Sequence, residues 1–271
     1  MDKKIETQYI YPCIKWIGGK TLQTKIIIPK ILERLKIKTV YVEPFVGGGS
    51  IIIELLKQCY LNGITNISFY CSDINEVLIR MYNEIKNNPI ELIEKLKQYI
   101  DKDNKDDYNR IRNEFNLNPQ VEQFIYLNKR CFRGLFRVNK RNEFNSSYNK
   151  TKNPPVFQEH NIIALSNLFT RYNVKFEISN FFERKFENCV MYLDPPYFET
   201  FSEYTICGFN YDEYLKKLKE IRMNKSIKLI HSNSEMFSSI YQSEEDIEKI
   251  FAQDRMNTKT QIKLRCELLY S

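Results

Sequence analysis

Short apolar runs alternate with helical repeats along much of this 271-residue chain. Residues 39–43 are β-branched and aromatic and end at Pro44, which is typical of a strand, and residues 51–60 follow with the apolar character of a helix. A second strand over 67–71 and a second helix over 74–86 come next. This order forms a βαβ unit, which favours a parallel strand pair joined by a right-handed crossover.

The middle of the chain has a different pattern. Helical spacing runs through residues 89–100, 108–115 and 121–129 with no strand between them, which indicates a helical insert. Strand and helix patterns alternate again afterwards. The elements expected there are helices over 158–171 and 211–223 and strands over 174–178, 189–193, 227–231 and part of 260–270. The whole pattern predicts an α/β fold, a doubly wound sheet interrupted by a mostly helical insert.

The composition and the N-terminal residues indicate in which compartment the protein is expected. Its charged and hydrophobic fractions, 28% and 42%, are near the averages of globular domains, and no apolar run approaches the roughly eighteen residues of a membrane helix. The first ten residues lack the apolar stretch of a signal peptide. We therefore expect a cytoplasmic, intracellular protein without membrane contact.

Cysteine usage argues against a metal site. The cysteines are scattered singly without a CxxC pair, and two histidines cannot complete a zinc site. We expect free, buried thiols in a reducing compartment and no bound metal. The seven cysteines are Cys13, Cys59, Cys71, Cys131, Cys189, Cys207 and Cys266.

Basic residues are concentrated between Lys129 and Lys152. This window holds eight basic residues against the single acid Glu143, so its net charge of +7 equals that of the whole chain. Such a window can be a solvated loop, but arginine and lysine also bind phosphates and guanine edges. Aromatic residues interleave these charges and are expected to offer bases a stacking surface; they are Phe132, Phe136, Phe144 and Tyr148.

The tetrapeptide Asp194-Pro195-Pro196-Tyr197 follows an expected strand and is the most specific chemical signal. Two prolines fix φ and lack N–H donors, so the loop leaves the sheet rigidly. The Asp194 carboxylate and the Pro195 carbonyl can accept hydrogen bonds from an exocyclic amine, and Tyr197 offers a face to a planar base. An amine held in this way becomes a nucleophile toward a methyl sulfonium. The alternative is a rigid turn without chemistry.

A glycine loop lies between the first expected strand and its helix. Gly47, Gly48 and Gly49 let the backbone approach a ligand closely, and Asp73 ends the second strand, where an acid can hold a ribose hydroxyl pair. The spacing is not the GxGxxG of dinucleotide folds, so a plain turn is the alternative.

Several motifs, taken in their order along the chain, resemble the Dam-type, alpha-group family of S-adenosylmethionine-dependent DNA adenine-N6 methyltransferases. The main ones are KWIGGK at 15–20, EPFVGGGS at 43–50, SDIN at 72–75 and DPPY at 194–197, and further matches are YLN at 126–128, GLFRVN at 134–139, EFN at 143–145 and ELL at 267–269. The resemblance implies a Rossmann-like methyltransferase fold. It also implies transfer of a methyl group from S-adenosylmethionine to N6 of a flipped-out adenine in a short duplex site, GATC or a related sequence.

The resemblance assigns roles to individual residues near the glycine loop and the Asp-Pro-Pro-Tyr loop. The catalytic residues would be Asp194, Pro195, Pro196 and Tyr197, where aspartate at the first position favours adenine over cytosine. The cofactor residues would be Trp16, Lys20, Phe45, Gly47, Gly49, Asp73, Phe181 and Asp194. Trp16 could otherwise be a core residue. Asn180 departs from the pattern, since relatives often carry an acid there.

The resemblance also implies that the basic window is a target-recognition β-hairpin. Lys15, Leu135, Arg137 and Lys150 fall where bases are contacted, and Phe132 falls beside the flipped base. The residues expected to contact DNA are Lys15, Lys129, Phe132, Arg133, Leu135, Arg137, Asn139, Lys140, Arg141, Asn145 and Lys150. Ser147 stands where close relatives that read GATC often carry proline.

We expect a cofactor-binding catalytic domain of residues 1–100 and 157–271 and a target-recognition insert of residues 101–156. The methyl group would pass by direct displacement, with double-stranded DNA as substrate. A monomer or weak dimer is expected, and a restriction endonuclease is a candidate partner. Two alternatives stay open: an RNA or protein amide methyltransferase, and a DNA-binding subunit without catalysis. Asparagine at position 194 would have favoured the protein substrate, and the intact Asp194, Tyr197, Lys20 and Asp73 argue against the inactive subunit.

Overall fold

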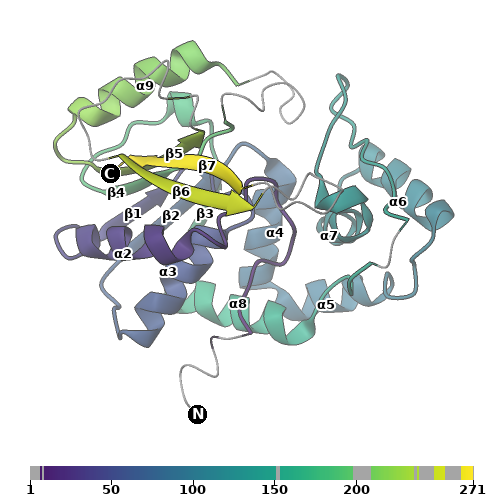
Figure 1. Cartoon of the computed structure of the whole chain (residues 1–271). Coiled ribbons are helices and arrows are strands. Elements are labelled where there is room, and N and C mark those ends of the chain that lie inside the picture. Colours follow the sequence, from purple (N-terminus) through teal and green to yellow (C-terminus); the bar gives the residue numbers. More distant parts are fainter. Residues whose placement is uncertain are drawn as a thin grey trace.

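A seven-stranded sheet with helices on both faces forms the centre of the protein (Figure 1). The computed structural model describes residues 7, 9–150, 153–197, 209–234, 237, 247–253 and 264–270, with the backbone alone over 247–253 and 264–268. The strands are β1 (Val40–Glu43), β2 (Ser68–Asp73), β3 (Lys175–Ile178), β4 (Val190–Leu193), β5 (Lys228–Ser234), β6 (Ile247–Gln253) and β7 (Leu264–Tyr270). The helices are α2 (Thr24–Leu35), α3 (Ser50–Leu61), α4 (Glu76–Asn87), α5 (Pro89–Lys97), α6 (Lys105–Leu117), α7 (Val121–Arg130), α8 (Glu159–Arg171) and α9 (Tyr211–Met223), with 3-10 turns η1 (Phe132–Gly134) and η2 (Phe181–Glu183).

The strand order is β3-β2-β1-β4-β5-β7-β6. Strands β1 to β5 are parallel to one another, whereas β7 is antiparallel to both β5 and β6. The chain winds outward from β1 in one direction and from β4 in the other. Such a reversal creates a crevice at the carboxyl ends of the two central strands. This topology confirms the predicted Rossmann-like, doubly wound fold.

Both faces of the sheet are covered. In β1, Tyr41 packs with α2, α3, α4 and α8, and the next residue, Val42, packs with α9 in a second cluster. Successive strand residues point to opposite faces, so one short strand contributes to both clusters. Figure 1 shows α9 above the sheet and α2 and α3 below it. All four residues of β4 are buried, as expected for a parallel strand covered on both sides.

Helices α5, α6 and α7 lie beside the sheet, at the right of Figure 1. Between α7 and α8 the chain forms a hairpin over residues 131–148, with antiparallel bridges joining Cys131 to Tyr148 and Val138 to Phe144. The predicted helical insert with a β-hairpin is therefore present. Its boundaries at residues 101 and 156 stay a prediction.

The 131–148 hairpin is fastened to α6 by hydrogen bonds. The Asn116 amide accepts from Phe144 N at 2.8 Å and donates to Phe144 O at 3.1 Å. The Tyr108 hydroxyl donates to Ser146 O at 2.8 Å. Because these side chains bond the hairpin backbone, α6 determines where the hairpin lies.

The structure also differs from the predicted elements in three places. Helix α2 and strand β6 have no counterpart in the prediction, and β5 continues past His231 through three further polar residues to Ser234. Among the cysteines with described side chains, all are unpaired: Cys13, Cys59, Cys71, Cys131 and Cys189. Cys207 and the side chain of Cys266 lie outside the described part of the chain.

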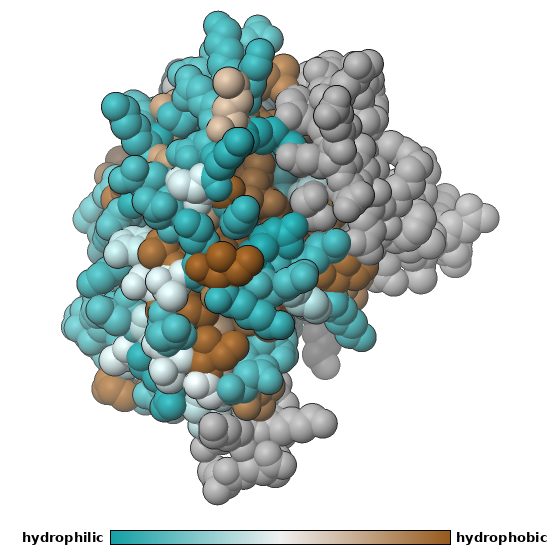
Figure 2. All heavy atoms as spheres, turned by 90° about the vertical axis from the view of Figure 1, so that its left-hand side faces the viewer, coloured by the Kyte–Doolittle hydropathy of each residue, from teal (hydrophilic) through white to brown (hydrophobic). Residues whose placement is uncertain are grey.

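The side of the molecule at the left of Figure 1 carries hydrophobic groups only in small, separate patches among hydrophilic ones, as far as described residues form it (Figure 2). Over the described ranges, no helix combines the length and apolar character needed to span a bilayer.

Candidate functional site

The carboxyl ends of β1 and β4 meet at the switch point of the sheet. The two strands pair through Tyr41–Val190 and Val42–Met191, so the loops that follow them lie side by side. These loops border a cavity of about 270 Å³. Its lining is Trp16 to Lys20, Glu43, Phe45 to Ile51, Asp73 to Asn75, Phe136, Asp194 to Tyr197 and Phe209.

The glycine loop packs directly against Trp16. A Cβ atom at Gly47 would lie 2.9 Å from the indole ring, and one at Gly48 would lie 2.7 Å from Trp16 Cβ. Gly49 has φ of +75° and begins α3 without a side-chain cap. The N–H groups of a first helical turn have no partner within the helix, so this end of α3 can donate to a ligand.

Asp73 joins the end of β2 to the glycine loop. Its Oδ2 accepts from Gly47 N at 3.1 Å and its Oδ1 from Asn75 N at 3.0 Å. Burial raises the pKa of Asp73, and these backbone N–H groups oppose the rise. Ile74 N–H also acts on this carboxylate, and a carboxylate has about four lone-pair positions, so Asp73 keeps acceptor capacity for a hydroxyl of a ligand.

A buried ammonium connects three segments of the site. Lys20 Nζ lies 2.8 Å from Asp194 Oδ2 and donates to Gly18 O at 2.8 Å. It also lies 4.7 Å from the centroid of the Tyr197 ring. Lys20 therefore contacts both ends of the Asp-Pro-Pro-Tyr loop.

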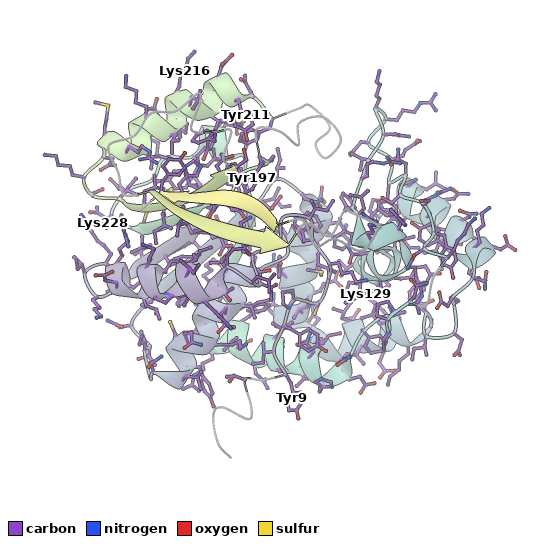
Figure 3. The ribbon with its side chains drawn as sticks, viewed as in Figure 1. Tyr9, Lys129, Tyr197, Tyr211, Lys216 and Lys228 are labelled. Carbon is purple, nitrogen blue, oxygen red and sulfur yellow. The ribbon has the colours of Figure 1, made fainter. Side chains whose placement is uncertain are left out.

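Pro196 in this loop is held from the opposite side. The Tyr211 hydroxyl, at the start of α9, donates to Pro196 O. Figure 3 shows Tyr211 and Tyr197 at the same end of the sheet. Among described residues, none donates to the Pro195 carbonyl. Tyr211 was not predicted as a site residue, because a tyrosine in an amphipathic helix is typical of a core position.

Glu43 is a second unpredicted member of the cavity wall. It is buried, and the Tyr41 hydroxyl donates to its Oε2 at 2.9 Å. Burial raises the pKa of Glu43 well above its ordinary value, and the nearby Asp194 charge adds to the rise, while the Tyr41 bond opposes it. These effects favour the neutral carboxyl. The sequence motif contains Glu43, but no local pattern signals its burial.

Most residues predicted to hold the cofactor share this cavity. Phe181 is the exception, since it packs behind Phe45, with ring centroids 4.9 Å apart, and does not line the cavity. Asn180 bonds within its own turn, to Phe182 N and Glu183. The predicted cofactor residues in the wall are Trp16, Lys20, Phe45, Gly47, Gly49, Asp73 and Asp194.

The base of the 131–148 hairpin lies against the segment before Trp16. The Asn128 amide accepts from Lys15 N at 2.9 Å and donates to Lys15 O at 2.8 Å and Gly134 O at 3.2 Å. Turn η1 presents Phe132, 45% exposed, with the Arg133 guanidinium 5.0 Å from its ring centroid. Lys15, Phe132 and Arg133 are thus brought together.

The remainder of the hairpin carries the other predicted DNA contacts. Arg137 Nε donates to Asn145 Oδ1 at 2.9 Å, which orients the guanidinium. Lys140, Arg141 and Lys150 are exposed, and Leu135 is half-buried. The Asn139 amide builds the turn: its oxygen accepts from Arg141 N and Glu143 N, and its nitrogen donates to Glu143 Oε2.

The predicted aromatic stacking surface is wrong. Phe144 is buried, Phe136 stacks on Trp16 with centroids 5.9 Å apart, and the Tyr148 hydroxyl donates to Asp103. These rings pack inward against Trp16 and against aromatic side chains of α6 and α7. Among the four, Phe132 alone is exposed.

Lys129 lies apart from the hairpin surface. It lines a separate hollow of about 230 Å³ between α7 and α8, with Cys13 and Phe157 among the walls. Burial lowers the pKa of Lys129. Figure 3 shows Lys129 on α7. Among the other predicted DNA contacts, Lys15 is near enough for its charge to add to the lowering of the Lys129 pKa, but the Lys129 side chain lines the hollow instead of the exposed hairpin surface.

Comparison with known proteins identifies the family of this chain. The model of the D12 class of N6 adenine-specific DNA methyltransferases matches residues 16–258. The chain belongs to this family. It is an adenine-specific DNA methyltransferase, as the sequence motifs predicted.

This methyltransferase has relatives among modification enzymes. It is 35% identical to the type II methyltransferase M.MjaIII of Methanocaldococcus jannaschii over 92% of this chain and 94% of that protein. It is 30% identical to the type II methyltransferase M1.LlaDCHI of Lactococcus lactis subsp. cremoris (76% and 74% covered) and to a DNA adenine methylase of Vibrio cholerae (74% and 72% covered). Within the described part of the methyltransferase, no cluster of metal-ligating side chains occurs.

Proposed function

We propose that this methyltransferase binds S-adenosylmethionine in the 270 Å³ cavity and methylates N6 of an adenine flipped out of a short duplex site, GATC or a related sequence. One observation carries the proposal: Lys20 joins Asp194 and Tyr197 beside the glycine loop. A ligand bound at the loop and an amine bound at Asp194 would therefore share one cavity.

The wall of the cavity fits the cofactor. The carboxylate of Asp73 faces it with lone pairs for ribose hydroxyls, and the first turn of α3 offers N–H groups to a carboxylate. Phe45 and Trp16 supply apolar walls. The cofactor would supply a methyl group on a sulfonium, and these residues would bind and orient it.

The Asp-Pro-Pro-Tyr loop would hold the target base. The Asp194 carboxylate and the Pro195 carbonyl accept the two N–H groups of the adenine amine, and Tyr197 stacks on the base. Accepting both hydrogens draws the amine lone pair out of conjugation and toward the methyl group. Lys20 holds Asp194 Oδ2 at 2.8 Å, so the carboxylate is oriented before the base arrives.

The hairpin would read the DNA. An adenine inside a duplex cannot reach this cavity, so the base must leave the stack. Phe132, exposed beside Lys15, would fill the vacated space, and Arg137, oriented by Asn145, would donate to a guanine edge. The same proposal takes residues 1–100 and 157–271 as the catalytic domain and 101–156 as the recognition insert.

We further propose that the enzyme acts as a monomer or weak dimer. Its likeness to type II methyltransferases favours a restriction endonuclease as its biological partner. Methylation of random-sequence duplex DNA, followed by single-molecule mapping of N6-methyladenine, would identify the recognition site.

Asp194→Ala tests the chemical role. Losing the acceptor should lower single-turnover methylation about 10²-fold or more, the usual effect of removing a positioned electrostatic group. Cofactor affinity, measured by calorimetry, should fall far less than turnover, because the Asp73 carboxylate and the first turn of α3 are unchanged. The exposed Asp101→Ala variant is the matched control and should keep normal turnover. Near-normal turnover in folded Asp194→Ala would refute the role.

A further inference from the structure

Strand β5 ends in four consecutive buried polar residues. His231, Ser232, Asn233 and Ser234 are each no more than 1% exposed. Buried polar side chains are costly unless they form hydrogen bonds, and the side chains of His231, Ser232 and Asn233 do so. Some partners lie within the core: Ser232 Oγ bonds the Tyr192 hydroxyl at 2.9 Å. The Asn233 side chain instead lies next to Tyr211.

Asn233 lies between the end of β5 and Tyr211. Its Oδ1 accepts from Ser234 N at 2.8 Å, its NH₂ group lies 3.4 Å from His231 Nε2, and its side chain is near enough to the Tyr211 phenol to lower its pKa. The Tyr211 hydroxyl donates to Pro196 O. Tyr211 thus connects the buried polar end of β5 to the loop.

The direction of the Tyr211–Pro196 bond follows from its two atoms. A carbonyl oxygen has no proton to donate, so the single proton of the phenol is directed to Pro196 O. Burial raises the pKa of Tyr211, and Asn233 opposes the rise. The hydroxyl therefore keeps its proton at neutral pH and stays a donor to Pro196 O.

The hydrogen bond to Pro196 O matters because the proline ring already restricts one of the two backbone dihedrals of this residue. The Pro196 ring fixes φ, and a hydrogen bond to the Pro196 carbonyl restrains ψ. With both dihedrals restrained, the peptide that leads to Tyr197 cannot rotate. Lys20 fixes Asp194 on the other side of Pro195. The Pro195 carbonyl thus lies between two anchored neighbours.

We propose that Tyr211 is a positioning residue for methyl transfer, because its hydrogen bond holds the Pro196 carbonyl and so orients the Pro195 carbonyl and the Tyr197 ring toward the target adenine. Its side chain does not line the cavity. The inference rests on the proposed role of the Asp194–Tyr197 loop. Figure 3 shows Tyr211 reaching this end of the sheet from α9.

Tyr211→Phe tests the inference by removing one oxygen atom. Single-turnover methylation at saturating duplex DNA and S-adenosylmethionine should fall roughly 10-fold, the effect of one buried hydrogen bond on a barrier. The KM for DNA and the Kd for cofactor should stay within about twofold of wild type, since the groups that bind them are unchanged. This split between kcat and KM distinguishes positioning from a general loss of structure.

Tyr214→Phe is the matched control. Tyr214 is a buried phenol on the same helix, and its hydroxyl bonds His231 Nε2 at 2.9 Å instead of the loop. Both variants lose one buried hydroxyl and should lose similar thermal stability, but Tyr214→Phe should keep its methylation rate. A Tyr211→Phe rate within twofold of wild type, or an equal fall in both variants, would overturn the inference.

If Asp194→Ala abolishes turnover while Tyr211→Phe does not slow it, the inference fails and the proposed function stands; normal turnover in Asp194→Ala rejects the proposed function itself.

Discussion

Lys20 and Glu43 are ionisable residues in the same cavity wall, but their surroundings give them different roles. Lys20 is paired with Asp194 at 2.8 Å and carries its charge into the loop. Glu43 has a phenol as its hydrogen-bond donor, and burial raises its pKa well above the ordinary range. A neutral carboxyl at Glu43 avoids a second negative charge next to Asp194.

Glu43→Gln should become more stabilising as pH rises. The folded pKa of Glu43 is raised above the unfolded value of 4.5, so its contribution is fully present below pH 4.5 and is lost as pH increases toward the folded pKa. Glutamine avoids this loss. The stability difference between variant and wild type should grow by up to about 1.4 kcal/mol per pH unit.

Urea unfolding of both proteins at several pH values between 5 and 8 measures this difference. Glu187→Gln, at an exposed carboxyl, controls for the removal of one acid. A difference independent of pH would show that Glu43 is ionised in the folded protein.

At the scale of elements, helix α7 joins the hairpin to the segment that carries Lys15. Asn128 bonds both Lys15 and Gly134, and a Cβ atom at Gly134 would lie 2.4 Å from Lys15 Cβ. Only glycine permits this approach, because the contact atom is attached to the backbone and cannot swing away. The close contact places the 15–20 segment and the hairpin in one unit.

Gly134→Ala should therefore destabilise the protein more than Gly63→Ala. Both glycines have positive φ, +70° and +68°, so both substitutions carry a backbone cost of about 1–2 kcal/mol. At Gly63 nothing lies within 4 Å of the new atom. At Gly134 the clash with Lys15 adds about 1–3 kcal/mol.

Chemical denaturation of the two variants gives the comparison, and DNA affinity should weaken in Gly134→Ala alone because Lys15 is displaced. Equal destabilisation would mean that the Lys15 segment moves aside freely.

At the scale of the whole molecule, the position of a charge matters more than the net charge. Lys140 and Arg141 are exposed on the hairpin, whereas Lys216 and Lys228 are exposed on the side of α9 and β5, away from the hairpin (Figure 3). Phosphate contacts release counterions, so only cations that touch DNA contribute to the salt dependence of binding. The fold separates these two groups of cations.

Lys140→Gln with Arg141→Gln should weaken cognate and non-cognate duplexes alike. The slope of log affinity against log salt should shrink by about two, close to one per phosphate contact. Lys216→Gln with Lys228→Gln removes the same charge and should leave the slope nearly unchanged. Titrations at several salt concentrations decide the outcome. Equal changes in both pairs would show that net charge, rather than hairpin contact, governs binding.

Physical reasons explain which elements the sequence predicted and which it missed. Strand β4 was predicted from a short apolar run, because this central parallel strand is buried on both faces, and α9 was predicted with its observed bounds. Helix α2 was missed because Pro29 lies inside it, and proline usually ends a helix. The end of β5 was missed because buried polar residues resemble a loop, and only the fold supplies partners such as the Tyr192 hydroxyl.

The sequence by itself determined the order of most elements and the family, because these follow from local spacing and from motifs that are contiguous in the chain. The tertiary structure decided that Lys20 joins Asp194 to Tyr197, that burial raises the pKa of Glu43, that Phe181 packs behind Phe45, and that Lys129 lines a separate hollow. It also placed the Tyr211 hydroxyl against Pro196. Each of these depends on burial or contact between residues far apart in the chain, and no local pattern encodes them.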